Sequence, residues 1–259
     1  MKKGICQLCL KENNLVKSHI LSEFMYDELK DPIKGGMIQT SFKTKPNSPN
    51  AFLANTLYTG LYDDEILCEK CDNNVLGRLE TYGALFIQGS SDSTPVGVIL
   101  KEKSTKGLMV VGNIDYTKLK LFLLSILWRA SISKKATFSQ VSLGSKHTEK
   151  IRKMIINNDA GNSIEYPMVI YAHFVSDSIT GKIISNPIKI KDHDGIRYFY
   201  FMGRIKVMYY ISNHSIPPEV RAVLLRPSGE ASLVEIDSER DQQFYEKFFL
   251  KPLSTKTTA

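Results

Sequence analysis

The chain has 259 residues, of which 42% are hydrophobic and 24% are charged. A chain of this composition can bury a core, which excludes a disordered, collagen-like or coiled-coil protein, and four cysteines are too few for a disulfide-dense secreted one. The net charge of +7 weakly favours anionic partners. Residues 1–90 carry 10 basic and 11 acidic side chains, whereas residues 91–259 carry 24 and 16. Any electrostatic attraction for nucleic acid is therefore expected from the second part.

The beginning of the chain has no apolar core typical of a signal peptide and no cleavage site of small residues. Its longest apolar run, residues 119–128, is interrupted by Lys120 and Ser125 and is shorter than the roughly 20 residues that span a bilayer. We expect a cytoplasmic protein without a membrane partner, in which thiols stay reduced.

A polar, turn-rich stretch at residues 88–95 is the best candidate for a linker. It predicts an N-terminal domain over residues 1–90 and a basic α+β domain over residues 91–259, which would bind substrate or a partner. A second polar stretch, residues 43–50, is interpreted as a loop inserted in the first domain.

All four cysteines lie in Cys-x-x-Cys pairs, Cys6/Cys9 and Cys68/Cys71. Each pair can form a knuckle, a tight turn that directs two thiolates at one ion, and two knuckles complete a tetrahedral zinc site. The 58 residues between the pairs are tolerable because the entropy of loop closure rises slowly with length. We predict a structural zinc closed by four thiolates. Redox-active dithiols or buried unpaired cysteines are the alternatives.

The segments around the knuckles have their own patterns. Residues 15–21 predict a short strand that contains His19, and residues 63–68 predict a second strand. Residues 72–86 have helix character, with Asp72 or Asn73 as the N-cap. Gly77 and Gly83 weaken that helix and permit close backbone approach. The order is knuckle, histidine strand, insert, strand, knuckle and helix.

This order resembles the zinc-stabilised branch of the HNH (ββα-metal) endonucleases, and the second knuckle is similar to that of the recombination endonuclease VII group. In these families a Cys-x-x-Cys precedes an acidic residue followed by His-Ile, and Leu-Cys-x-x-Cys is followed by His or Asn. The resemblance is carried by Ser18-His19-Ile20 and by Leu67-Cys68-Glu69-Lys70-Cys71-Asp72, and it covers residues 4–87. It implies an α+β protein, with a treble-clef zinc module of the ββα-metal type followed by a larger mixed α+β domain.

The resemblance also implies roles for individual residues. His19 would be the general base that activates water against a phosphodiester. Asp72 would bind a catalytic divalent ion, Mg²⁺ or Mn²⁺, and Asp63 would orient His19 or assist the metal. The chain departs from the motif by having Ser18 in place of the acidic residue, Ser22 in place of Pro, Asp63 in place of Asn, and Asp72 in place of the final His or Asn.

Simpler interpretations exist for the same residues. His19 can hydrogen-bond a backbone carbonyl or lie unused beside the zinc, and Asp72 directly after a knuckle is a natural helix cap. Side chains near the motif that would compensate for the missing acidic residue are Glu23, Asp64, Asn73 and Glu80.

Hydrophobic periodicity in the second part predicts alternating helices and strands. Helices are expected over residues 116–134, 146–157 and 239–250, strands over 166–175 and 182–191, and hairpins over 196–212 and 222–236. In the first helix, which has one apolar side, Trp128 and Arg129 are expected at the core or its boundary. Two further groups have both a nucleic-acid interpretation and a structural one: the basic cluster Lys146, Lys150, Arg152 and Lys153, and the tyrosines Tyr198, Tyr200, Tyr209 and Tyr210.

Together these features predict a metal-dependent HNH-like endonuclease that hydrolyses phosphodiester bonds in DNA, or in RNA. Its partners would be nucleic acid and a regulatory protein, and the resemblance suggests a role in restriction or phage defence. The alternative is a non-catalytic zinc-binding module for nucleic-acid or protein interaction, which Ser18 and the acidic balance of residues 1–90 favour.

Overall fold

The computed structural model describes residues 2–43, 51–89, 95–101, 107–173, 183–193, 195–211 and 216–236, together with residues 239 and 243. The predicted linker and inserted loop lie mostly outside these residues, as does the predicted helix over 239–250.

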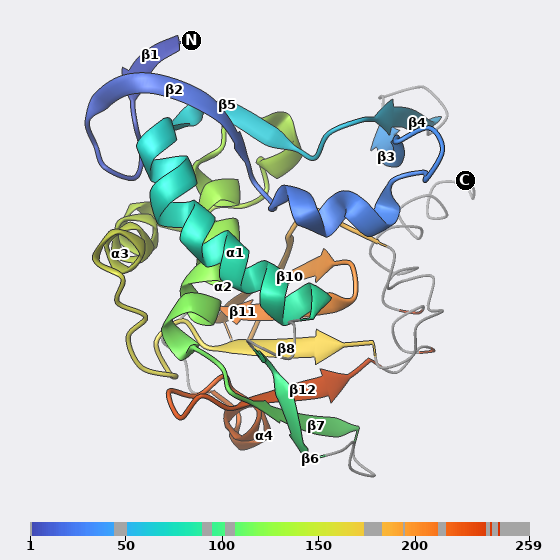
Figure 1. Ribbon diagram of the computed structural model, residues 1–259, viewed down its shortest axis with the longest axis vertical. Coiled ribbons are helices and arrows are strands. Elements are labelled where there is room, and N and C mark those ends of the chain that lie inside the picture. Colours follow the sequence, from blue (N-terminus) through green and yellow to red (C-terminus); the bar gives the residue numbers. More distant parts are fainter. Residues whose placement is uncertain are drawn as a thin grey trace.

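A three-stranded antiparallel sheet, in the order β1-β2-β5, forms the N-terminal part (Figure 1). Its strands are β1 (Lys2–Ile5), β2 (Glu12–His19) and β5 (Tyr62–Cys68). The two strands predicted around the knuckles are therefore confirmed, and they pair with each other. Between them lie a 3₁₀ helix (Glu23–Leu29) and a hairpin of β3 (Met37–Lys43) and β4 (Ala51–Leu57).

The second knuckle is part of a helix. The chain leaves β5 at Cys68 and continues as a π-helix (Lys70–Leu76) and then as α1 (Gly77–Gln88). The prediction that Asp72 or Asn73 caps this helix is wrong, because helical backbone already begins at Lys70. Asp72 lies within the first turn, where its side chain is available for a contact outside the helix.

The remainder of the chain is built on a seven-stranded mixed sheet in the order β6-β7-β12-β8-β11-β10-β9. Only β12 and β8 pair in parallel among these described strands. The strands are β6 (Val98–Lys101), β7 (Leu108–Gly112), β8 (Met168–Ala172), β9 (Ile188–Asp192), β10 (Gly195–Met202), β11 (Ile205–Tyr210) and β12 (Ala231–Glu235). The helices are α2 (Tyr116–Ile132), a 3₁₀ turn (Ala136–Phe138), α3 (Gly144–Asn157) and α4 (Pro218–Ala222). The protein is thus a mixed α+β structure, as predicted.

The sheet confirms one predicted hairpin and corrects the other. Strands β10 and β11 form the hairpin expected over residues 196–212. The hairpin expected over 222–236 is wrong, because α4 ends at Ala222 and β12 pairs with β7 and β8 instead. Pro218 at the helix start favours α4, and the apolar residues of β12 fit a central strand.

Helix α2 lies between α1 and the sheet (Figure 1). Every residue from 119 to 130 is buried. The helix is therefore buried on all sides, and not only on the one apolar side that the sequence predicts. Contacts come from several directions: Tyr209 Oη on β11 donates to the Leu123 carbonyl at 3.1 Å, and Trp128 Nε1 donates to the Thr148 carbonyl on α3 at 3.1 Å. Covering from all sides explains why this helix is apolar around its whole circumference.

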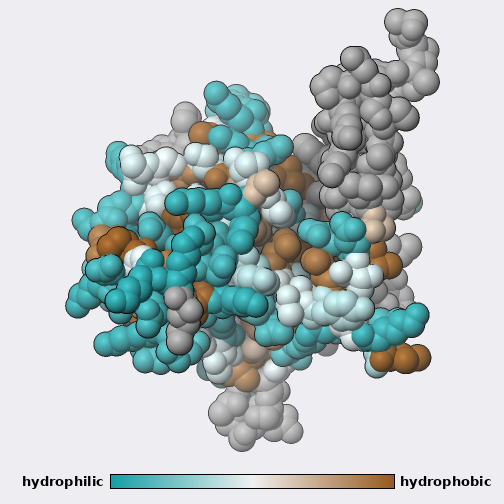
Figure 2. Space-filling view, turned by 90° about the horizontal axis from the view of Figure 1, so that it is seen from above, coloured by the Kyte–Doolittle hydropathy of each residue, from teal (hydrophilic) through white to brown (hydrophobic). Residues whose placement is uncertain are grey.

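The main hydrophobic core runs without a break from the N-terminal part to the large sheet, and includes Leu21, Leu79, Phe122 and Tyr200. The division at residue 90 stays a prediction. None of the helices in the described ranges is long and apolar enough to cross a bilayer. Figure 2 shows that hydrophilic residues cover most of the described surface seen from above the β1-β2-β5 sheet.

The approach of α1 to α2 depends on a residue without a side chain. A Cβ atom at Gly83 would lie 2.5 Å from the ring of Phe122, so the ring or one of the helices would have to shift. The close approach expected for a glycine of this helix is thereby confirmed at Gly83.

We therefore expect Gly83→Ala to lower the free energy of unfolding by about 1–3 kcal/mol, measured by urea denaturation. Gly77→Ala in the same helix is the control. Its new Cβ would lie 3.6 Å from the nearest atom, the Asp72 carbonyl oxygen, so stability should be unchanged or higher by up to ~1 kcal/mol. Equal losses in both variants would contradict this account.

Candidate functional site

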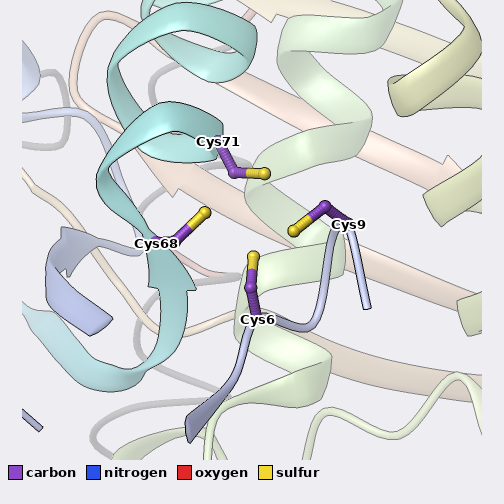
Figure 3. Close-up of side chains that lie close together, drawn as sticks. All are labelled: Cys6, Cys9, Cys68 and Cys71. Atoms are coloured by element: carbon purple, nitrogen blue, oxygen red, sulfur yellow. The ribbon is translucent and has the colours of Figure 1, made fainter. Parts of the chain in front are cut away.

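The four cysteines converge from two regions of the chain (Figure 3). Cys6 and Cys9 lie in the turn between β1 and β2, whereas Cys68 ends β5 and Cys71 is in the π-helix. Their sulfur atoms all lie within 4.8 Å of one another, and no disulfide joins them. The knuckle at Cys6 is tied to β5 because the Gln7 N–H donates to the Ile66 carbonyl at 2.8 Å.

This cluster has the chemistry of a structural zinc site. Zinc bonds of about 2.3 Å to four thiolates place sulfur atoms ~3.8 Å apart, so only a small contraction is needed. Burial and the neighbouring sulfurs raise the pKa of the Cys71 thiol well above its usual range, and a bound cation would favour the thiolate instead. The four-cysteine cluster therefore suggests a zinc-binding site and is consistent with the predicted structural zinc.

A side chain from the second part of the chain contacts the first knuckle. Arg152 on α3 donates from Nη1 to the Leu8 carbonyl at 2.7 Å and pairs with Glu149 at 2.7 Å. Two other members of the predicted basic cluster also have acidic partners: Lys150 lies 2.5 Å from Glu165, and Lys153 lies 3.7 Å from Glu149. These ion pairs favour the structural interpretation of the cluster over a phosphate-binding face.

His19 is the last residue of β2. Its ring meets the Tyr62 ring edge to face, with the centroids 6.3 Å apart, and its backbone carbonyl accepts a hydrogen bond from Arg129 Nη1 at 2.5 Å. Its Nε2 is buried and has no hydrogen-bond partner among the described residues.

Ser18 and Asp72 meet directly. The Ser18 hydroxyl, which is fully buried, donates to Asp72 Oδ1 at 2.6 Å. Burial raises the pKa of Asp72 above its ordinary value, and the bond from Ser18 and the charge of Arg129 oppose that shift. The resemblance places metal ligands at these two positions, and here a hydroxyl and a carboxylate bond each other.

Asp63 has a different surrounding from the one expected. It opposes Ser18 across the β2–β5 ladder, at an irregularity where the register shifts. Its carboxylate is 1% exposed and accepts from Ser133 Oγ at 2.6 Å and from the Glu65 N–H at 2.9 Å. These bonds hold Asp63 within β5 and join it to the end of α2.

Two further charged residues belong to this region. Glu80 on α1 accepts from Ser22 Oγ at 2.9 Å and from Arg129 Nη1 at 2.7 Å. Glu80 was one of the side chains expected to compensate for the missing acidic residue, whereas Arg129 lies outside the resemblance. The sequence signal for Arg129 is an arginine at the end of the apolar run 119–128, because a charge next to such a run is buried only with partners.

The four tyrosines with a nucleic-acid interpretation are not exposed. Tyr198, Tyr200, Tyr209 and Tyr210 are all buried, so they pack in the core and present no rings for base stacking. Beyond the cysteines, no group of three or more acidic, histidine or cysteine side chains in the described ranges is close enough to share an ion.

Comparisons of the chain with protein-family models, curated proteins and solved structures found no match.

We expect the purified protein to contain about one zinc ion per chain, and Cys68→Ser to lose it together with thermal stability, since the metal contributes folding energy. Zinc can be measured by atomic absorption and stability by circular dichroism. Gln7→Ala, which changes an exposed residue between two ligands, is the matched control and should keep the zinc. Full zinc occupancy in Cys68→Ser would contradict a four-thiolate site.

Proposed function

We propose that the chain is an endonuclease of the ββα type that hydrolyses phosphodiester bonds in DNA or RNA. The observation that carries the proposal is the meeting of Ser18 with Asp72 at 2.6 Å, next to His19 at the end of β2. This contact joins the position before the motif's histidine, Ser18 on β2, to the motif's last position, Asp72 in the π-helix. The cysteine cluster lies next to both elements.

His19 is the general base of the proposed reaction. It takes a proton from a water molecule, whose oxygen attacks the phosphorus atom while the bond to the leaving oxygen breaks. The leaving oxygen then takes a proton from solvent. A histidine suits this role because its ordinary pKa lies near neutral pH.

A catalytic Mg²⁺ or Mn²⁺ does not fit the described residues. Asp72, Glu80 and Asp63 bond Ser18, Arg129 and Ser133, and no three acidic or histidine side chains in the described ranges are close enough to share an ion. A second cation beside the guanidinium would also be repelled. The proposed reaction therefore has no step through a divalent ion, although the resemblance implies one.

The basic balance of residues 91–259 supports nucleic acid as the substrate, and a regulatory protein partner and a role in phage defence or restriction remain part of the proposal. The competing proposal is a non-catalytic zinc module that binds nucleic acid or protein. It is favoured by Ser18, which replaces an acidic residue, and by the complete pairing of the three carboxylates.

Cleavage assays distinguish the two proposals. We expect the protein to nick supercoiled plasmid or to cut single-stranded DNA or RNA, and His19→Ala to reduce the rate by a factor of about 100 or more while zinc stays bound. His193→Ala, which changes an exposed histidine after β9, is the control and should cut as the wild type does. Equal activity of His19→Ala and the wild type would refute the assignment of the base, and no cleavage by a zinc-loaded wild type would favour the binding module.

A further inference from the structure

Cys9 is the least enclosed member of the cysteine cluster. The other three cysteines are buried, whereas Cys9 is partly exposed. A ligand on an exposed turn has little packing around it, so hydrogen bonds to the turn have to hold its sulfur where a metal ion needs it. One such bond is local, because Asn13 Nδ2 donates to Cys9 Sγ at 3.9 Å. The position of Cys9 therefore depends on polar contacts from outside the knuckle.

Arg152 provides a second contact, from a distant part of the chain. Its Nη1 donates to the Leu8 carbonyl at 2.7 Å. That oxygen belongs to the peptide group that joins Leu8 to Cys9, so the bond restricts the peptide directly before a cysteine of the cluster. The Leu8 side chain is buried. The same residue is therefore held both by packing and by the guanidinium.

The guanidinium is itself held in one orientation. Its Nε and Nη2 donate to the two carboxylate oxygens of Glu149, at 2.7 and 2.8 Å. The Arg152 side chain is only 13% exposed. Paired bonds between two planar groups limit rotation, and here they leave Nη1 directed at the knuckle. A lysine has no such pair of donors, so it could not make the same set of contacts.

Helix α3, which carries Arg152, is packed firmly on the rest of the protein. Its residues Ile151 and Ile155 are buried, and Trp128 on α2 donates to the Thr148 carbonyl at 3.1 Å. Arg152 therefore reaches the knuckle from a rigid helix, 144 residues further along the chain than the carbonyl that it binds.

Arg152 also brings positive charge close to the cysteines. The pKa of Arg152 is raised, chiefly by its bonds to Glu149 and to a smaller extent by the charge of Cys9. Four thiolates outweigh the charge of one zinc ion, so the occupied site would be an anion. A cation at this place attracts that negative charge, and Glu149 opposes part of the attraction.

We propose that Arg152 is a positioning residue of the zinc site: from α3 it fixes the peptide group before Cys9 and offsets part of the charge of the thiolates, so that tight zinc binding requires this helix as well as the four cysteines. Arg152 acts through the Leu8 carbonyl and is not itself a ligand. This gives one member of the predicted basic cluster a role in metal binding. The inference does not depend on the proposed nuclease activity.

The first test measures zinc affinity in competition with a chelator of known affinity. Arg152→Gln removes both the charge and the paired donors, and it should bind zinc about 10- to 100-fold more weakly than the wild type. Arg152→Lys keeps the charge without the paired donors, so its zinc affinity should lie between the two. Wild-type affinity in a folded Arg152→Gln would refute the inference.

Two variants of the same helix are the controls. Lys153→Gln removes an exposed cation that lies 3.7 Å from Glu149, and Ile151→Val loosens the buried face of α3 without changing its charge. Both should bind zinc within about twofold of the wild type. A loss in Ile151→Val as large as that in Arg152→Gln would overturn the inference, because general loosening of the helix would then explain both.

The second test is spectroscopic. Co²⁺ bound by four thiolates absorbs visible light in bands that depend on the arrangement of the ligands. Cobalt-loaded Arg152→Gln should have shifted or weaker bands, and Arg152→Lys should restore part of the wild-type spectrum. If Arg152→Gln does not fold, Arg152→Lys decides: wild-type zinc affinity together with a wild-type cobalt spectrum would refute the inference. A wild type that binds neither ion would refute it as well, and would leave the nuclease proposal to the cleavage assays.

Discussion

The convergence of four sulfur atoms is the constraint on which the N-terminal half depends. A three-stranded sheet and one helix bury little surface by themselves, and the knuckles that meet come from opposite ends of a long insert. Once Cys6 and Cys9 face Cys68 and Cys71, β2 must lie beside β5, and the helix must begin at the second knuckle. The contact between Ser18 and Asp72 is a consequence of this geometry.

Charge balance explains the rest of the site. Ionised groups are buried at a high cost unless each has a partner, and three carboxylates lie close to one sheet edge and its helix. The chain provides a hydroxyl for Asp72, a hydroxyl and an amide for Asp63, and an arginine for Glu80. Each of the three carboxylates thus has a hydrogen-bond donor within the protein.

The features that could be predicted from the sequence are those with local signals. Cys-x-x-Cys spacing predicts the cluster, and alternation predicts β2, β5 and the hairpin of β10 and β11. Arg129 could not be placed in the site, because its partner His19 is 110 residues away and nothing near either residue encodes the contact. The prediction of a hairpin over 222–236 failed for a similar reason, because β12 pairs with β7 and β8, which are distant in the sequence.

The contacts of Arg129 and Arg152 with the N-terminal part can form only late in synthesis. All four cysteines have been synthesised once residue 71 has left the ribosome, so the four-cysteine cluster can form early. The carbonyls of His19 and Leu8, however, obtain their donors only when Arg129 and Arg152 have emerged, 110 and 144 residues later. A nascent or prematurely ended chain could therefore bring its cysteines together while the His19 carbonyl still lacked its donor. Such a fragment would hold its four cysteines together before the long-range contacts of the candidate site have formed.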